Sequence, residues 1–282
     1  YKKYVIKGVD IRGNVYGGAE RACLGYELND TKGNAVVNIG KDNAGVLEGN
    51  ATFAGSGMVF GSNKFKGTPY GNTTVNVYKT AHTGNPAAPA PYTGLGNYYP
   101  DPIPDPVTVE WMRTLPKERQ NYAIQAVYGG GDMSDYIPRW DGKIATTHIY
   151  ECKENTVYEV YGGGNAASGG DLNATYKTST DLIVDGGRIH HLFGGGNGLV
   201  TPANITGTAN TTLYGGLIDE FYGGSNSTGY IFNINIQEVS GTCPKVIDTT
   251  YSGGNEADMI GEIYHFIDCE HGGNYGSFYG ES

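Results

Sequence analysis

The most specific chemistry in this sequence lies in five ionisable residues: Glu159, His190, His191, Asp219 and Glu220. Glu159, His191 and Glu220 each stand two positions before the aromatic residue of a repeated aromatic-Gly-Gly motif. If successive motifs stack as neighbouring strands, the two glutamates flank an imidazole at a separation of about 5 Å. Carboxylates on both sides raise the pKa of an imidazole and can form a proton-transfer or metal-binding patch. The same stack also fits an outward charge ladder in which acid and base alternate, which is the interpretation we favour.

The aromatic-Gly-Gly motif is the element that must position these side chains. Its copies lie at Tyr16, Tyr128, Tyr161, Phe193 and Tyr222, with weaker ones at Phe60, Tyr251 and Tyr279. From Tyr128 onward the copies are 28 to 33 residues apart, a period typical of solenoids. The clearest copy predicts strands at 180–184 and 188–193, and the variable stretches predict a third short strand, such as 230–236. The pattern therefore predicts an all-β parallel β-helix with glycine-rich corners, in which the Asn after the glycines forms an internal ladder or caps the turn.

One proline-rich segment interrupts the repeat. We expect a single domain over residues 1–282, which residues 79–122 leave as a loop excursion, because proline cannot donate to a strand ladder. Within the excursion, residues 107–120 are expected to form a strand or a short helix. The excursion is either a functional arm or a cap that shields the sheet edges.

Charge and composition exclude several classes of protein. The chain of 282 residues has a formal net charge of −10, which argues against nucleic acid or an anionic membrane surface as a partner. Its apolar runs are shorter than the roughly 20 residues that a membrane span requires. No phosphate-binding or serine-hydrolase motif is present, and we expect no cofactor. Because the sequence starts without Met or a signal peptide, we expect it to be a segment of a longer protein.

The four cysteines are Cys23, Cys152, Cys243 and Cys269, and no C-x-x-C motif occurs. Cys243 and Cys269 are about one repeat apart, so they either pair as a disulfide or stay free buried thiols. His265, Cys269 and His271 fall on one face of an extended strand and form a weak candidate zinc site. A surface strand with a partly buried cysteine is the interpretation that we favour.

Aromatic residues outside the motif are candidates for stacking on sugar rings. These are Trp111, Trp140, Tyr98, Tyr99 and Tyr136. The alternative, which we favour for tyrosines at the glycine corners, is that the rings simply cover the backbone there.

The pattern Ile-x-x-Val-Tyr-Gly-Gly-Gly-Asn resembles secreted or surface right-handed parallel β-helix (pectin-lyase-like) repeat proteins of gut Bacteroidetes-type bacteria. The resemblance covers about 11–16 and 124–279 and is clearest over 157–226. Proteins of that shape include adhesins, phage-tail proteins and polysaccharide-cleaving enzymes. The resemblance implies a right-handed coil and an extracellular or cell-surface location.

These observations predict a non-catalytic extracellular module, structural or adhesive, that binds glycan or a cell-surface protein through a β-helix face. The first alternative is a polysaccharide lyase or hydrolase that works from the face bearing Glu159, His190, His191, Asp219 and Glu220. The second alternative is a stalk or filament segment, whose partner would be further coils or copies of itself.

Overall fold

A computed structural model describes much of the chain. The described residues are 2–6, 10–11, 13–25, 32–40, 52–53, 57–78, 80, 107–114, 122–150, 152, 156–171, 173, 176–268, 270 and 273–280. Tyr98, Tyr99, Cys269, His271 and most of the proline-rich excursion lie outside these residues. The described part is nearly all β, with one short helix, α1 (Val109–Met112).

Two sheets of parallel strands build the molecule. Sheet 1 has the order β1 (Lys2–Ile6), β4 (Ala35–Ile39), β7 (Thr73–Val77), β9 (Ile144–Ile149), β11 (Ser179–Val184), β13 (Ile205–Leu213) and β15 (Tyr230–Glu238), and both β17 (Asp258–Met259) and β18 (Ile263–Ile267) pair with β15. Sheet 2 has the order β3 (Val15–Tyr16), β6 (Met58–Phe60), β8 (Ile124–Tyr128), β10 (Thr156–Tyr161), β12 (Arg188–Phe193), β14 (Gly216–Tyr222), β16 (Lys245–Tyr251) and β19 (Asn274–Tyr279). A separate pair joins β2 (Asp10–Ile11) to β5 (Thr52–Phe53).

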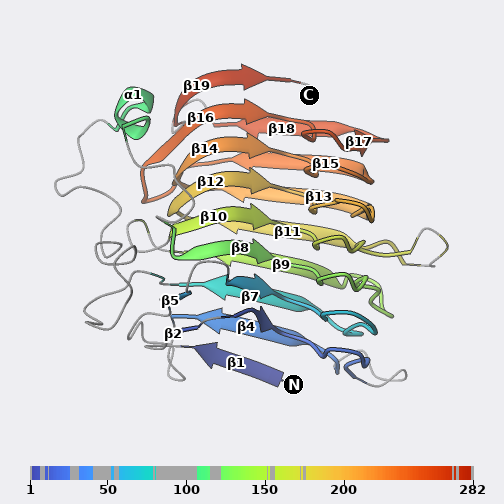
Figure 1. The fold of residues 1–282 in the computed structure, drawn as a ribbon. Helices are drawn as coiled ribbons and strands as arrows, with labels where there is room; N and C mark the ends of the chain where they lie inside the picture. The colour runs from blue at the N-terminus through green and yellow to red at the C-terminus, as the bar shows by residue number, and fades with distance from the viewer. Residues whose placement is uncertain are drawn as a thin grey trace.

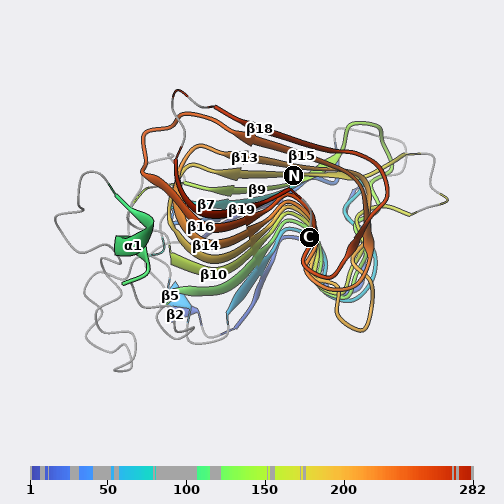
Figure 2. The ribbon, with the colours of Figure 1, turned by 90° about the horizontal axis from the view of Figure 1, so that it is seen from above.

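The chain alternates between the two sheets, so each pass adds one strand to each of them. We call one strand of each sheet, with the turns that join them, a rung. The rungs stack in chain order from the N-terminal to the C-terminal end (Figure 1), and the two sheets face each other as layers (Figure 2). Strands such as β7 and β11 alternate buried and half-buried side chains. Their inward Val, Ile and Leu side chains form one apolar core between the sheets.

The aromatic residues of the repeated motif stack into a continuous column on sheet 2. The eight rings run from Tyr16 to Tyr279, with neighbouring ring centroids 4.7 to 4.9 Å apart and interplanar angles of 4° to 11°. This spacing equals that of adjacent strands, so each ring covers the one below it. The column confirms that the motif marks equivalent positions of successive rungs.

The asparagine that follows the glycines forms a second column. The Nδ2 of Asn197, Asn226 and Asn255 each donates to the Oδ1 of the asparagine one rung earlier, at 3.0 Å. Asn165 ends the column by donating to Asp132 at 3.0 Å. The predicted internal ladder is therefore confirmed. It gives hydrogen-bond partners to the side-chain amides of these asparagines, which lie in tight turns.

Two expectations about local structure are resolved here. The prediction of a third strand in each repeat is wrong, because residues 230–236 belong to β15, the sheet 1 strand of their own rung. Part of 107–120 is helical, as α1. Its Val109 and Met112 pack on Leu217 and Val246 of sheet 2, and Arg113 forms an ion pair with Asp248. This helix covers the outer side of the sheet (Figure 2).

The cysteine pairing differs from the one considered. Cys152 and Cys243 form a disulfide that joins positions 91 residues apart, with their Cα atoms separated by 5.2 Å. Cys243 is therefore neither paired with Cys269 nor a free thiol, while Cys23 is free and exposed. Cys152 and Cys243 lie in the connections that follow β9 and β15, which are three strands apart in sheet 1, so the disulfide spans several rungs.

Candidate functional site

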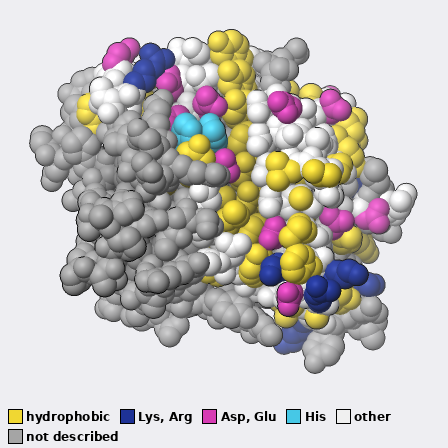
Figure 3. Space-filling model, viewed as in Figure 1, with side chains coloured by type: hydrophobic (Ala, Val, Ile, Leu, Met, Phe, Trp, Pro, Cys, Tyr) yellow, Lys and Arg dark blue, Asp and Glu magenta, His cyan; other side chains and the backbone are white. Residues whose placement is uncertain are grey.

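The predicted ionisable side chains meet on the outer face of sheet 2. Glu159 of β10 pairs in register with His191 of β12, which pairs with Glu220 of β14. The His191 Nε2 lies 3.3 Å from Glu220 Oε2, and its Nδ1 lies 3.9 Å from Glu159 Oε1. On the face shown in Figure 3, exposed histidine side chains lie beside acidic ones and near a vertical band of hydrophobic side chains. The expected acid–base–acid row is therefore present.

The second pair of predicted residues is held by a buried arginine. Asp219 accepts from Arg188 Nη2 at 3.0 Å and forms an ion pair with Nη1 at 2.8 Å, and the Arg188 side chain is fully buried. Asp219 also contacts the His190 Nδ1, at 2.7 Å. The His190 and His191 rings stack with centroids 3.9 Å apart. Asp219 therefore neutralises a buried guanidinium and is tied to its neighbours.

The charges in this row are matched within the row itself. Burial of His191 disfavours its protonation, but hydrogen bonds to Glu159 and Glu220 outweigh burial and raise its pKa to about 9. The contact with His191 lowers the pKa of Glu220, against the effect of burial. At neutral pH the row therefore holds an imidazolium between two carboxylates, which is an ion-pair ladder.

This ladder predicts a pH-dependent stability. Because the pKa of His191 is raised from 6.5 to about 9, its contribution is fully present below about pH 6.5 and is lost as the pH rises toward 9. The loss is at most about 3 kcal/mol, and solvent screening reduces it because the Glu220 side chain is 43% exposed. The lowered pKa of Glu220 has a separate effect on stability. Its contribution is present above the ordinary value of 4.5 and is lost as the pH falls below it.

Chemical unfolding between about pH 6.5 and pH 9 measures this effect. We expect the slope of unfolding free energy against pH to flatten in His191→Gln, which keeps hydrogen bonding but cannot become charged. His190, Tyr158, Glu159 and Glu220 contact the same imidazole, and they stay unchanged in this variant. An identical slope in both proteins would assign the pH dependence to another group.

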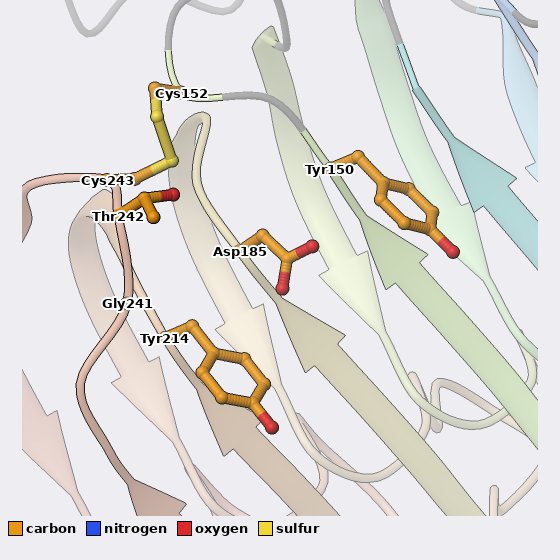
Figure 4. A pocket seen from close by; sticks show the side chains of 7 residues that line it. All are labelled: Tyr150, Cys152, Asp185, Tyr214, Gly241, Thr242 and Cys243. Atoms are coloured by element: carbon orange, nitrogen blue, oxygen red, sulfur yellow. A yellow bond between two sulfur atoms is a disulfide. The ribbon is translucent and has the colours of Figure 1, made fainter.

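A different set of side chains lines a pocket at the ends of the sheet 1 strands. Tyr78, Tyr150, Asp185 and Tyr214 directly follow β7, β9, β11 and β13, so they form a row across four rungs. We call these four residues the tyrosine row. The last three line a pocket of about 400 Å³, together with Gly241, Thr242 and the Cys152–Cys243 disulfide (Figure 4).

Contacts within the tyrosine row fix the orientation of its rings. The Tyr78 and Tyr150 rings stack with centroids 4.2 Å apart, and the His148 ring stacks on Tyr150 at 3.5 Å. The His148 Nε2 lies 2.9 Å from Asp185 Oδ2, which fixes the carboxylate in turn. Burial, then the hydrogen bond to Tyr78, raises the pKa of Tyr150, so its phenol remains protonated and can donate. Tyr214 is 37% exposed at the edge of the pocket.

Of the residues predicted to stack on sugars, the three in the described part of the chain are not all exposed. Tyr136 is 1% exposed and donates its hydroxyl to the Gly71 carbonyl at 2.7 Å, so its assignment as a surface platform is wrong. Trp111 packs against the apolar cluster under α1. Trp140 is half-buried, with its indole nitrogen out of contact with solvent. The tyrosine row is therefore a better aromatic platform than these residues.

The weak zinc candidate is not supported at its one described member. The His265 ring is engaged on both nitrogens, by Ser252 at 2.9 Å and by Glu238 at 2.8 Å, which leaves neither nitrogen for a metal. Within the described ranges, no group of three or more His, Cys, Asp or Glu side chains is arranged to hold a metal ion.

Sequence reasoning missed the tyrosine row, although a signal for it exists. Each of these residues follows a strand with alternating apolar side chains, as in Thr146-Thr147-His148-Ile149-Tyr150 and Asp181-Leu182-Ile183-Val184-Asp185. Aligning the repeats on the end of this strand, rather than on the aromatic-Gly-Gly motif, would have placed the four residues in one row.

Comparison of the chain with protein-family models, with curated proteins and with solved structures finds no significant match. In the described part of the chain, no helix has the length and hydropathy that a membrane span requires. The function is therefore argued from the geometry of the side chains described above.

Proposed function

We propose that this chain is an extracellular surface module that binds glycan without cleaving it, through the tyrosine row of sheet 1. The observation that carries the proposal is the pocket of about 400 Å³ between Tyr150, Asp185 and Tyr214. Tyrosine offers an apolar ring face and a hydroxyl on one side chain, which suits the mixed surface of a sugar. The Asp185 carboxylate can accept from sugar hydroxyls, so the pocket combines a few polar groups with aromatic walls.

The proposal includes a finer architecture, a right-handed parallel β-helix of about 28–33 residues per coil. The parallel pairing and the alternation between two sheets support it. The resemblance of the repeat to secreted and surface β-helix proteins, together with the disulfide between Cys152 and Cys243, supports an extracellular location. Disulfides persist mainly in oxidising compartments.

The ion-pair ladder favours binding over catalysis as the main role. An imidazole that acts as a general base must be unprotonated at the working pH, whereas His191 has a pKa of about 9 and is held as a cation by two carboxylates. Asp219 is 2% exposed and already paired with Arg188. These features make the row a structural support for sheet 2 rather than a polysaccharide lyase or hydrolase site.

Substitutions in the tyrosine row test the proposal. We expect Tyr214→Ala and Asp185→Asn each to weaken glycan binding by about tenfold, equivalent to ~1.4 kcal/mol, because the first removes one wall of the pocket and the second replaces a charged acceptor oxygen by an amide group. Binding is measured as retardation in gels that contain a single polysaccharide, with thermal unfolding as a check on folding.

Tyr264→Ala is the matched control, because Tyr264 is an exposed tyrosine of the same sheet, 56% exposed on β18. We expect this variant to bind as tightly as the wild type. Equal retardation of all three variants and the wild type would refute the tyrosine row as the binding site. Binding to a protein partner but to no polysaccharide would favour an adhesive module that recognises protein. Self-association would favour the filament alternative.

A further inference from the structure

Four polar side chains interrupt the apolar core at the C-terminal end of the stack. They are Ser252, His265, Glu238 and Tyr275, from both sheets of the last rungs. The Ser252 Oγ lies 2.9 Å from His265 Nδ1, and the His265 Nε2 lies 2.8 Å from Glu238 Oε1. The Tyr275 hydroxyl donates to the other oxygen, Oε2, of Glu238 at 2.5 Å. A serine, an imidazole and a carboxylate are thus joined in one hydrogen-bonded chain.

Each of these positions has a different kind of residue in the preceding rungs. Glu238 stands in register with Leu213, which pairs with Val184. His265 pairs with Ile236, and Tyr275 pairs with Ile247. A buried polar side chain destabilises a core unless it is hydrogen-bonded, and all four have their partners in one another. At these positions the last rungs therefore have hydrogen-bonded polar side chains, where the preceding rungs have apolar ones.

Ser252 replaces the glycine that follows the aromatic residue in earlier rungs. Gly162, Gly194 and Gly223 occupy this position, and their backbone amides donate to the aromatic carbonyl one rung further along. Ser252 makes the corresponding bond to the Tyr279 carbonyl at 3.0 Å, so its backbone lies as theirs do. The difference is a hydroxymethyl group that points to the inward-facing His265.

We propose that Ser252, His265 and Glu238 form a nucleophilic triad that takes the acyl group of a carboxylic ester. The proposal does not rest on glycan binding: its side chains face the core, although Glu238 is in register with Leu213, the residue before Tyr214 of the tyrosine row. Nucleophile, base and orienting acid are each within hydrogen-bond reach of the next, which is the geometry that activates a serine. Glu238 is fully buried, as the orienting acid of such a set requires.

The imidazole is used in the reverse sense from the common serine triad, with Nδ1 toward the serine. Glu238 accepts from Nε2–H, which leaves the lone pair of Nδ1 to accept from the serine hydroxyl. The Tyr275 hydroxyl donates to the other carboxylate oxygen of Glu238 and so holds the carboxylate in this orientation. Either imidazole nitrogen can serve as the base, provided that the other one is held by an acceptor.

The reaction balances with water as the only co-reactant. Ser252 Oγ attacks the ester carbonyl carbon and passes its proton to Nδ1 of His265. The tetrahedral adduct then breaks its bond to the alcohol oxygen, and the alcohol leaves with that proton, so the acyl group stays on Ser252. Water attacks the acyl carbon and gives a proton to His265. The acid leaves, and the proton returns to the serine oxygen.

Phe278 lies beside the triad on the last described strand of sheet 2. Ser252 is 2% exposed, and Phe278 of β19, which is 45% exposed, has its ring centroid 5.0 Å from that of His265. β19 is the last strand of sheet 2 at the C-terminal end (Figure 1). An acyl group that enters beside Phe278 would meet the serine and the imidazole together.

Labelling with a fluorophosphonate probe tests the triad directly. We expect one covalent adduct per chain, located on Ser252 by peptide mass analysis, and hydrolysis of p-nitrophenyl acetate at a rate proportional to protein concentration. Ser252→Gly restores the glycine of the other rungs, so it should fold normally and lose both activities. Phe278→Ala should label several-fold faster because it opens the approach.

Two further variants separate a triad from a structural network. Glu238→Gln should slow labelling by about 10²-fold or more, because it removes the orienting charge. Ser225→Ala removes another fully buried serine near a glycine turn and should label like the wild type. The proposal is overturned if folded wild type and Phe278→Ala both carry no adduct on Ser252. It is equally overturned if a folded Glu238→Gln labels at the wild-type rate.

Discussion

Gly194→Ala should destabilise the protein by about 4 kcal/mol or more, at the upper end of single substitutions, or prevent folding. A Cβ on Gly194 would lie well under 3.0 Å from the Gly223 carbonyl oxygen of the next rung. The clash is with backbone that is itself hydrogen-bonded between rungs, so neither rung can move aside without breaking the ladder. The measurement is the unfolding free energy from chemical denaturation.

Gly280→Ala is the matched control for this prediction. Gly280 occupies the same position of the motif in the last described rung, and a Cβ there meets nothing within 4 Å. We expect it to change stability by no more than about 0.5 kcal/mol. Similar losses in both variants would show that the glycines act through backbone conformation rather than through the close approach of rungs. Ser252 carries a side chain at this position and still bonds to the next rung, which is the last described one, so the large loss is predicted for Gly194, which has described rungs further along on both sides, and not for every copy of the motif.

Loss of the Cys152–Cys243 disulfide has the second large expected effect. The two cysteines are 91 residues apart, and closing a loop of that size in the unfolded chain corresponds to about 4–5 kcal/mol in the loop-entropy model. We expect the Cys152→Ser, Cys243→Ser double variant to unfold at clearly lower denaturant concentration than the oxidised wild type. The double variant avoids leaving one unpaired thiol.

The tyrosine row gives this prediction a second readout. The disulfide lines the same pocket as Tyr150, Asp185 and Tyr214, so its loss should also weaken glycan binding under conditions in which the protein stays folded. Wild type treated with reductant should behave as the double variant does. An unchanged unfolding midpoint in the double variant would contradict a stabilising role for this bond.

Much of the stacking could be predicted from the sequence because the aromatic-Gly-Gly motif fixes the register. Aligning its copies placed Glu159, His191 and Glu220 in adjacent positions, and the structure pairs them so. The asparagine ladder followed from the same alignment. In each case the contact lies between equivalent positions of neighbouring rungs, which a repeat period alone determines.

Features that join different positions of the repeat could not be predicted in this way. Cys152 and Cys243 are 91 residues apart, about three repeats, so stacking alone would place them about 14 Å apart, and only the course of their connections brings them within disulfide reach. The Ser252–His265–Glu238 chain joins both sheets across the core, and a single repeat alignment does not show which residues face each other there. The described tyrosines include buried ones, such as Tyr136, and exposed ones, such as Tyr264, and their residue type alone does not separate them, which led to the wrong assignment of Tyr136 as a surface residue.

The most direct test of the proposed function is a polysaccharide screen that records retention and chain length together. Mucin, host glycosaminoglycans, pectins and bacterial capsular polysaccharides are each incubated with the wild type and with Tyr214→Ala. We predict retention of the wild type by at least one of them, weaker retention of Tyr214→Ala, and no shortening of the polymer. Shortening that disappears in Glu159→Gln or His191→Ala would contradict the account and establish a polysaccharide-cleaving enzyme.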